Sequence, residues 1–177
     1  MLESTAQSSF IDRMVGAARL DPQMYEEVEH DESATRQAMF VVVLGSLASG
    51  IGLLNGGLGG FAIGAVFAVA SWAAYAFIAY WVGTHIFKGP QTSATWGELL
   101  RTLGFASSPR LLFVLMVIPK VGLFIAFGVF VWTLFTTVIA IRQALDFDTG
   151  RAVATAIVSL IGLVVVSSIA IGLVGSA

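Results

Sequence analysis

The arginine at position 110 is the charged residue of this sequence best placed to bind a ligand. It follows Ser107-Ser108-Pro109 inside an apolar stretch, whereas nearly all other charges beyond the N-terminal segment fall at boundaries between such stretches. A charge at the bilayer centre costs about 2.5–3.5 kcal/mol on insertion scales, so it should face the protein interior or a water-filled cavity. A half-helix restarting at the proline would add free amides beside the cation. One hypothesis is therefore an anion or lipid-headgroup site formed by Arg110, Ser107 and Ser108. The alternatives are an Arg110 side chain that extends to the membrane interface or one that forms a salt bridge inside the bundle.

A second set of polar residues lies outside the apolar runs, on what we expect to be one side of a membrane. The set consists of Glu26, Glu27, Arg101, Arg142, Asp146 and Arg151. Helix ends that meet on this side would let Arg101 or Arg142 pair with a glutamate of the acidic segment or with Glu98. We therefore expect the N-terminal head to be ordered and to dock on this surface.

The two histidines offer little for catalysis. His30 shares a helix face with Glu26, a pair that could bind a metal or a partner weakly, although a solvated acidic helix is the simpler interpretation. His85 ends an apolar run, where we expect it at the membrane interface. The absence of cysteine excludes thiolate chemistry and disulfides. We therefore expect no catalytic residues, no metal site, no cofactor and no enzyme activity.

The composition indicates a membrane protein. The 177 residues are 57% hydrophobic and 11% charged, against about 25% charged residues in soluble domains. A net charge of −2 disfavours nucleic-acid binding, which needs a basic surface. Carboxylates are absent from the interiors of the apolar runs, with Glu98 only at the start of one of them, and this disfavours ion-coupled transport. A passive pathway lined by Thr133 and Thr137 stays open, although threonines bonded to their own helix carbonyls are the commoner case.

Five apolar runs reach the length of about 20 residues that a membrane-spanning helix needs. They cover residues 38–55, 60–83, 97–118, 121–143 and 152–174. Glycines and an asparagine at 55–60 predict a turn between the first two. The third span should break at Ser107–Pro109, because proline removes a backbone hydrogen bond. The predicted fold is an all-α, polytopic bundle of five transmembrane helices.

Residues 1–37 form a short polar head in this prediction. Ser9 can cap a helix with one apolar face, made of Phe10, Ile11, Met14, Val15 and Ala18. Asp12, Arg13 and Arg19 lie on its other side. This helix suits the headgroup region of a bilayer, and the alternative is packing on the protein's own loops. Asp21-Pro22 predicts the start of a second, acidic helix.

Basic residues near the span ends predict the orientation, because they collect on the cytoplasmic side. With five crossings, this side would hold Arg13, Arg19, Arg36, Lys88, Arg101, Arg142 and Arg151. Lys120 would lie outside, with Arg110 in the membrane or near that face. If segment 97–118 re-entered without crossing, Arg142 and Arg151 would move outside. The charges therefore favour a multi-pass membrane protein with a cytoplasmic N-terminus and an external C-terminus.

Small residues recur at every fourth position in two spans. The two stripes are Gly60, Gly64 and Ala68, and Ser168, Gly172 and Ser176. Such stripes let helix backbones approach closely, either inside one bundle or between two copies. The expected partners are therefore membrane lipids, other membrane proteins or a second copy of the chain.

Three segments resemble members of the Yip family, named for Ypt/Rab-interacting proteins. They are Arg19-Leu20-Asp21-Pro22 with Tyr25-Glu26-Glu27-Val28, then Leu99 to Pro109 (LLRTLGFASSP), and Ile141 to Phe147 (IRQALDF) followed by Thr149-Gly150-Arg151-Ala152. Their order and spacing carry the resemblance, which covers most of residues 10–175. It implies a five-span bundle with a cytoplasmic N-terminus, and for eukaryotic members a role in vesicle trafficking through Rab-type GTPases. The short head here lacks the long N-terminal region of many eukaryotic members and is similar to the opening of bacterial ones, so the resemblance implies a bacterial inner membrane.

These observations together favour a non-catalytic membrane adaptor or organiser of the Yip family. The alternative is a lipid- or solute-conducting membrane protein that uses the break in the third span.

Overall fold

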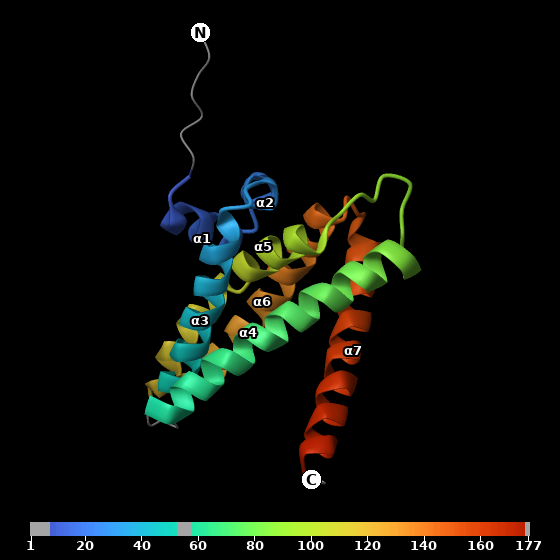
Figure 1. Ribbon diagram of the computed structural model, residues 1–177. Helices are drawn as coiled ribbons and strands as arrows, with labels where there is room; N and C mark the ends of the chain where they lie inside the picture. Colours follow the sequence, from blue (N-terminus) through green and yellow to red (C-terminus); the bar gives the residue numbers. More distant parts are fainter. Residues whose placement is uncertain (1–7, 53–57, 176–177) are drawn as a thin grey trace.

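The chain is helical along almost all of its described length. The computed structural model describes residues 8–52 and 58–175, and no strand occurs among them. Five helical segments are long and apolar enough to cross a membrane. They are Ala34–Gly52, Gly59–Ile86, Trp96–Val117, Gly122–Ala144 and Thr149–Ile169. The predicted fold class, an all-α membrane bundle of five spanning helices, is thus confirmed (Figure 1).

Two short helices, α1 (Phe10–Ala18) and α2 (Pro22–His30), form the head at one end of the bundle (Figure 1). Both begin at the predicted caps. The Ser9 hydroxyl accepts a hydrogen bond from the amide of Asp12, whose carboxylate accepts one from the amide of Ser9. Asp21 caps α2 with its carboxylate, and proline fills the first helical position.

The first two spans are α3 (Ala34–Gly52) and α4 (Leu58–Trp81), which continues as the π-helical turn η1 (Val82–Ile86). Helix α3 begins inside the segment 1–37 that was predicted as head, so it runs from the head into the membrane without a break. Of the turn predicted at 55–60, the first three positions lie outside the described residues and the last three already belong to α4.

The third span has two parts, α5 (Trp96–Ala106) and η2 (Ser108–Val117), which meet at Ser107. The break falls where Pro109 predicted it, and Thr95 caps the start of α5. The second part is a 3₁₀ helix, which the sequence did not predict. Because a 3₁₀ helix rises about 2.0 Å per residue, its ten residues cover about 20 Å, and together with α5 the segment is long enough to cross a membrane.

Glycines allow the third span to pack closely against α3. A Cβ atom at Gly104 would lie 2.5 Å from the Cβ of Ala38, and one at Gly52 would overlap the carbonyl oxygen of Phe113. Larger side chains at these two positions would force the helices apart. Two close helix contacts therefore use glycines on α3 and α5, outside the two predicted stripes.

The last two spans are α6 (Gly122–Ala144) and α7 (Thr149–Gly175). Helix α7 lies beside α4 near the head end and diverges from it towards the C-terminus (Figure 1). Outward side chains such as Leu123 and Phe124, at 81% and 77% exposed, form the apolar surface that lipid covers. Ser176, the last member of the second small-residue stripe, lies outside the described residues.

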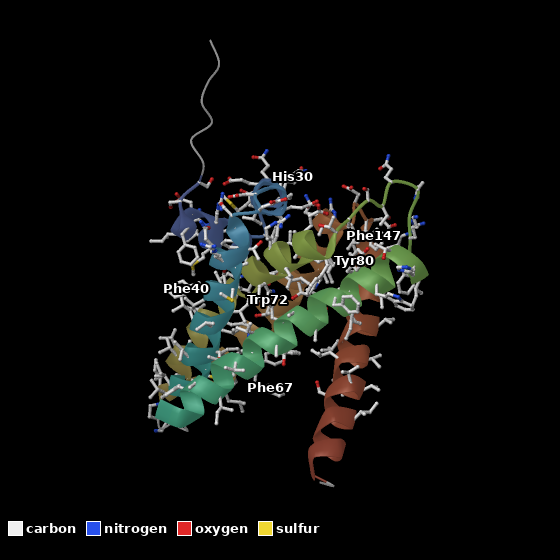
Figure 2. The ribbon with its side chains drawn as sticks, viewed as in Figure 1. His30, Phe40, Phe67, Trp72, Tyr80 and Phe147 are labelled. Atoms are coloured by element: carbon white, nitrogen blue, oxygen red, sulfur yellow. The ribbon has the colours of Figure 1, made fainter. Side chains whose placement is uncertain are left out.

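The buried core lies towards the head end, where α2, α3, α5 and α6 meet. Its larger side chains are Tyr25, Val28, Val41, Leu99, Leu103, Phe105, Ile141, Leu145 and Phe147. Oxygen and nitrogen atoms also gather at this end of the molecule (Figure 2). The best-packed part of the fold therefore lies directly beneath its most polar surface.

Candidate functional site at the head of the bundle

Arg13 is the buried centre of an ion-pair network that joins three helices. Its side chain is 1% exposed, and its Nη2 lies 3.0 Å from Glu27 Oε1 and 2.7 Å from Asp31 Oδ2. Its Nη1 donates to Gln37 at the start of α3 at 3.1 Å. Ser8 donates to Glu27 through both its amide and its hydroxyl. The fork of guanidinium donors thus ties α1, α2 and α3 together.

Both acids of this network are held as carboxylates. At Glu27, burial raises the pKa, but hydrogen bonds from Ser8 and Arg13 outweigh it and leave the pKa below its usual value. At Asp31, a hydrogen bond from the Ser33 side chain lowers the pKa, and Arg13 lowers it further. The network is therefore ionised at neutral pH. Removing the arginine would leave two carboxylates without their cation in a poorly hydrated place.

Arg101 fixes the head to the bundle from α5. Its side chain is buried, and its Nε donates to the carbonyl oxygens of Val28 at 3.1 Å and Glu29 at 2.9 Å. Its Nη2 also donates to the carbonyl of Glu29. These carbonyls belong to the last turn of α2, where intrahelical donors are lacking and the helix dipole is negative. Arg101 thus caps α2 from a neighbouring helix.

Two aromatic side chains complete the docking of the head on α6. The hydroxyl of fully buried Tyr25 contacts the carbonyl oxygens of Ala17 at 3.0 Å and Thr136 at 3.3 Å. The indole Nε1 of Trp132 donates to the carbonyl oxygen of Ala18 at 2.7 Å. Burial raises the pKa of Tyr25, so its phenol stays protonated and remains a donor. The C-terminal end of α1 is thus held by side chains from α2 and α6.

A polar cleft of about 450 Å³ opens between the docked head and the bundle. Its lining residues are Glu26, Glu29, His30, Ser93, Glu98, Gln143 and Asp146. They come from α2, from the start of α5 with the loop before it, and from the end of α6 with the turn after it. Four carboxylates therefore face one small volume, and the cleft is strongly acidic.

The charge of this cleft changes near neutral pH. Burial raises the pKa of Glu29 to about 7, and the negative charge of Glu98 adds to the effect. His30, whose ring Nδ1 hydrogen-bonds to the carbonyl oxygen of Glu26 at 2.8 Å, has a raised pKa because of that bond. Protons thus enter both groups more readily than they would in water.

The predicted polar cluster comes together only in part. Glu26 and Asp146 line the cleft. Arg101 lies behind them, but its donors reach backbone carbonyls where a glutamate side chain was expected. Glu27 pairs with Arg13 within the head.

The other two members of the predicted cluster take no part in the cleft. Arg151 forms an ion pair with Asp148, with Nε and Oδ2 3.4 Å apart, at the start of α7. The half-buried side chain of Arg142 makes no hydrogen bond with any residue that the structure describes, so its expected pairing with a glutamate does not occur there.

Arg110 lies in η2, the second part of the third apolar span. Its Cβ packs against α3 at Gly45, where an added Cβ would lie 3.2 Å away. At 1.5 Å per residue, Gly45 is about 16 Å along the 19-residue helix α3 from Ala34, near the middle of that apolar span. The guanidinium is half-buried and makes no hydrogen bond or ion pair within residues 8–52 and 58–175.

The groups expected to help Arg110 bind an anion are engaged elsewhere. The hydroxyls of Ser107 and Ser108 donate to helix carbonyls, at 3.2 Å and 2.6 Å. The Arg110 amide, which was expected to be free, donates to the carbonyl oxygen of Ser107 at 2.9 Å. The 3₁₀ geometry of η2 explains this, because it closes hydrogen bonds three residues apart directly at the break.

The remaining candidates for chemistry have structural partners. His85 stacks on Trp81 at the end of the second span, with ring centroids 5.2 Å apart. The Thr133 hydroxyl donates to the carbonyl oxygen of Val129 on its own helix at 2.8 Å. Over the described part of the chain, no three residues among His, Cys, Asp and Glu are grouped to hold a metal ion.

The sequence did not reveal the roles of several residues of the head. The sequence placed Arg13 on the polar side of α1. The acidic residues 14 to 18 positions later were a signal that this arginine has carboxylate partners there. Glu29, Gln37 and Trp132 carry no local signal, since their roles depend on how the helices meet.

Five spanning helices with an ordered head, fixed by two buried arginines and a buried tyrosine, define a polytopic helical membrane protein with a docked head. The sequence model of the Yip1 domain matches residues 20–171, and the chain belongs to the Yip family. Helix α1 precedes the matched residues. Searches of curated proteins and of solved structures found no match.

Proposed function

We propose that this protein is a non-catalytic membrane adaptor that presents an ordered acidic head at the cytoplasmic face of a bacterial inner membrane. One observation carries the proposal. Arg13 and Arg101 use their donors to fix the head to the bundle, while Glu26, Glu98 and Asp146 stay at a cleft that opens outward. Because much of the remaining surface is apolar and faces lipid, this surface is where a partner from the aqueous phase can bind.

The charge of the cleft favours a partner with lysine or arginine on its surface. Complementary charges guide two proteins together and set their orientation, and salt screens this attraction. A cytoplasmic position of the head is supported by the basic residues on its side of the membrane. An adaptor also agrees with the trafficking role that the family resemblance implies for eukaryotic members.

Affinity purification of the intact complex from native membranes tests this proposal. The cleft variant is Glu26→Gln with Asp146→Asn, and the matched control is Glu32→Gln, which removes an exposed acid of the head outside the cleft. We expect the cleft variant to lose most of the co-purified protein, and the control to retain it. Moderate salt should weaken recovery with the wild type. Equal recovery with all three proteins would refute a partner at this cleft.

One observation favours a second candidate function, conduction of a lipid or solute with an anionic-headgroup site at the break in the third span. The Arg110 guanidinium is unpaired among the described residues at a depth where a lone charge is costly. Native mass spectrometry of the purified protein can count bound phosphatidylglycerol. Arg110→Ala should reduce binding, whereas Lys120→Ala, beyond the end of the same span, should not. Unchanged binding in Arg110→Ala would exclude the headgroup site.

A further inference from the structure

Helix α1 buries a charged side chain and exposes apolar ones, whereas a helix surrounded by water would do the reverse. Arg13 and Ala17, four positions apart, are each 1% exposed and face the acids and the bundle. Ile11 and Val15, also four apart, are 68% and 41% exposed. Residues at this spacing share one helix face. The helix therefore buries its cation and presents two large aliphatic side chains to its surroundings.

The outward face of α1 is continuous with the lipid-facing surface of two spans. Phe10 contacts Phe40 of α3, with ring centroids 5.9 Å apart, and Phe40 is itself 53% exposed on the outer side of that span (Figure 2). At the other end of α1, the 39% exposed Trp132 of α6 donates to the carbonyl oxygen of Ala18. Both aromatic residues belong to membrane spans. Helix α1 thus lies on the outside of the bundle between two lipid-facing side chains.

Two exposed arginines flank this apolar surface. Arg19 follows the last residue of α1, and Arg36 lies on the first turn of α3, one turn before Met39 and Phe40 on the same face. Neither guanidinium makes a hydrogen bond or ion pair with another residue of the described ranges. Exposed cations one turn from exposed aliphatic and aromatic side chains suit a leaflet, where phosphates lie next to acyl chains.

We propose that α1 lies within the interface of the leaflet on the head side, with Ile11 and Val15 among the acyl chains and Arg19 and Arg36 against anionic phospholipid headgroups. The partner is a lipid surface, which recognises aliphatic side chains and cations together. This contact does not depend on the adaptor function, and it involves a helix that precedes the matched family domain. It anchors the outer edge of the head while Arg13 anchors the inner edge.

Site-directed spin labelling of the full chain tests this contact, and the absence of native cysteines makes single-cysteine variants unambiguous. Ile11→Cys and Val15→Cys would carry the nitroxide in bilayers of phosphatidylcholine and phosphatidylglycerol. Gln23→Cys on the exposed side of α2 reports water, and Phe127→Cys on α6 reports lipid. Collision with oxygen, which concentrates in lipid, is compared with collision with a water-soluble nickel chelate.

We expect the labels at 11 and 15 to collide with oxygen as the lipid control does, and Gln23 to collide with the chelate. Labels at 11 and 15 that behave like Gln23 would overturn the proposal. Labels that neither probe reaches would also overturn it, because a second copy or another protein would then cover α1.

The role of the two arginines has its own test. Arg19→Gln with Arg36→Gln should move the label at position 15 towards water in bilayers that contain phosphatidylglycerol, and less so in phosphatidylcholine alone. An unchanged depth in both bilayers would refute the contact with anionic headgroups. Amide exchange of α2 serves as the folding control, because the network around Arg13 does not include either arginine.

Discussion

Replacing Arg101 by methionine should release the head from the bundle while the spans stay folded. Methionine keeps an apolar stem but removes the donors to two carbonyl oxygens at the end of α2. A hydrogen bond from a charged donor contributes about 1.5–3 kcal/mol, and a cation at a helix C-terminus contributes about 0.3–1 kcal/mol. Because one guanidinium serves both carbonyls, these contributions are not additive, and we expect a loss of about 3 kcal/mol.

Amide hydrogen exchange on the full chain in lipid nanodiscs measures this loss. A change of about 3 kcal/mol corresponds to exchange roughly a hundredfold faster in α2 (Pro22–His30), with α6 unchanged. Arg101→Lys should give an intermediate rate, since it keeps the charge but loses the fork. Arg142→Met is the matched control, because it removes an arginine from the same end of the bundle. Equal protection of α2 in Arg101→Met and Arg142→Met would refute this account of docking.

Two further predictions concern pH and packing. The pKa of Glu29 is about 7 in the docked head against an ordinary 4.5, so the docked state holds the proton more tightly. The contribution of Glu29 to docking is therefore fully present below about pH 4.5, weakens as pH rises to about 7 and levels off above it. Glu27 and Asp31, whose pKa values are lowered, have the opposite sign, and their contribution is lost only as pH falls into the acid range. After allowance for solvent screening this amounts to about 1–2 kcal/mol. Exchange in α2 should accelerate over this window, and Glu29→Gln should remove most of the dependence, because His30, whose pKa is also raised, contributes the rest. A wild type with the same exchange protection across the window would contradict the prediction. Gly104→Leu should push α5 away from Ala38, cost about 3 kcal/mol or more and lower the midpoint of thermal unfolding. The control is Gly128→Leu, where an added Cβ meets open space, and it should leave the midpoint within a few degrees of the wild type. Equal midpoints for the two leucine variants would show that the close contact does not limit stability.

Local signals in the sequence were sufficient to predict much of the fold. The caps at Ser9 and Asp21 act on amides within three positions, so a short window contains the whole interaction. The break before Pro109 is equally local. The 3₁₀ conformation of η2 was not predictable, because the same apolar run fits an α-helix. The close contact of η2 with α3, between the carbonyl oxygen of Phe113 and Gly52, joins two segments that are distant in the sequence. No short window of sequence therefore contains it.

The site at the head was harder to predict, because its interactions join distant segments. A helical wheel places Arg13 opposite the apolar residues of α1 but does not say which side faces inward. The two acids that bind it lie 14 and 18 positions away, on the next helix and just after it. Arg101 is 72 and 73 positions from the carbonyls that it caps, and a backbone acceptor leaves no side-chain pattern at all.

The contacts of the two buried arginines, Arg13 and Arg101, leave the head with one acidic outer face and one apolar outer face. Six acidic residues fall within 21–32, and Arg13 pairs with only two of them. Arg101 neutralises none, because it binds carbonyl oxygens. The α2 side of the head therefore keeps a negative charge that an anionic leaflet repels, while the α1 side exposes Ile11 and Val15. With α1 in the lipid interface, this asymmetry holds the acidic cleft towards water, and it sets the direction from which a basic partner would approach.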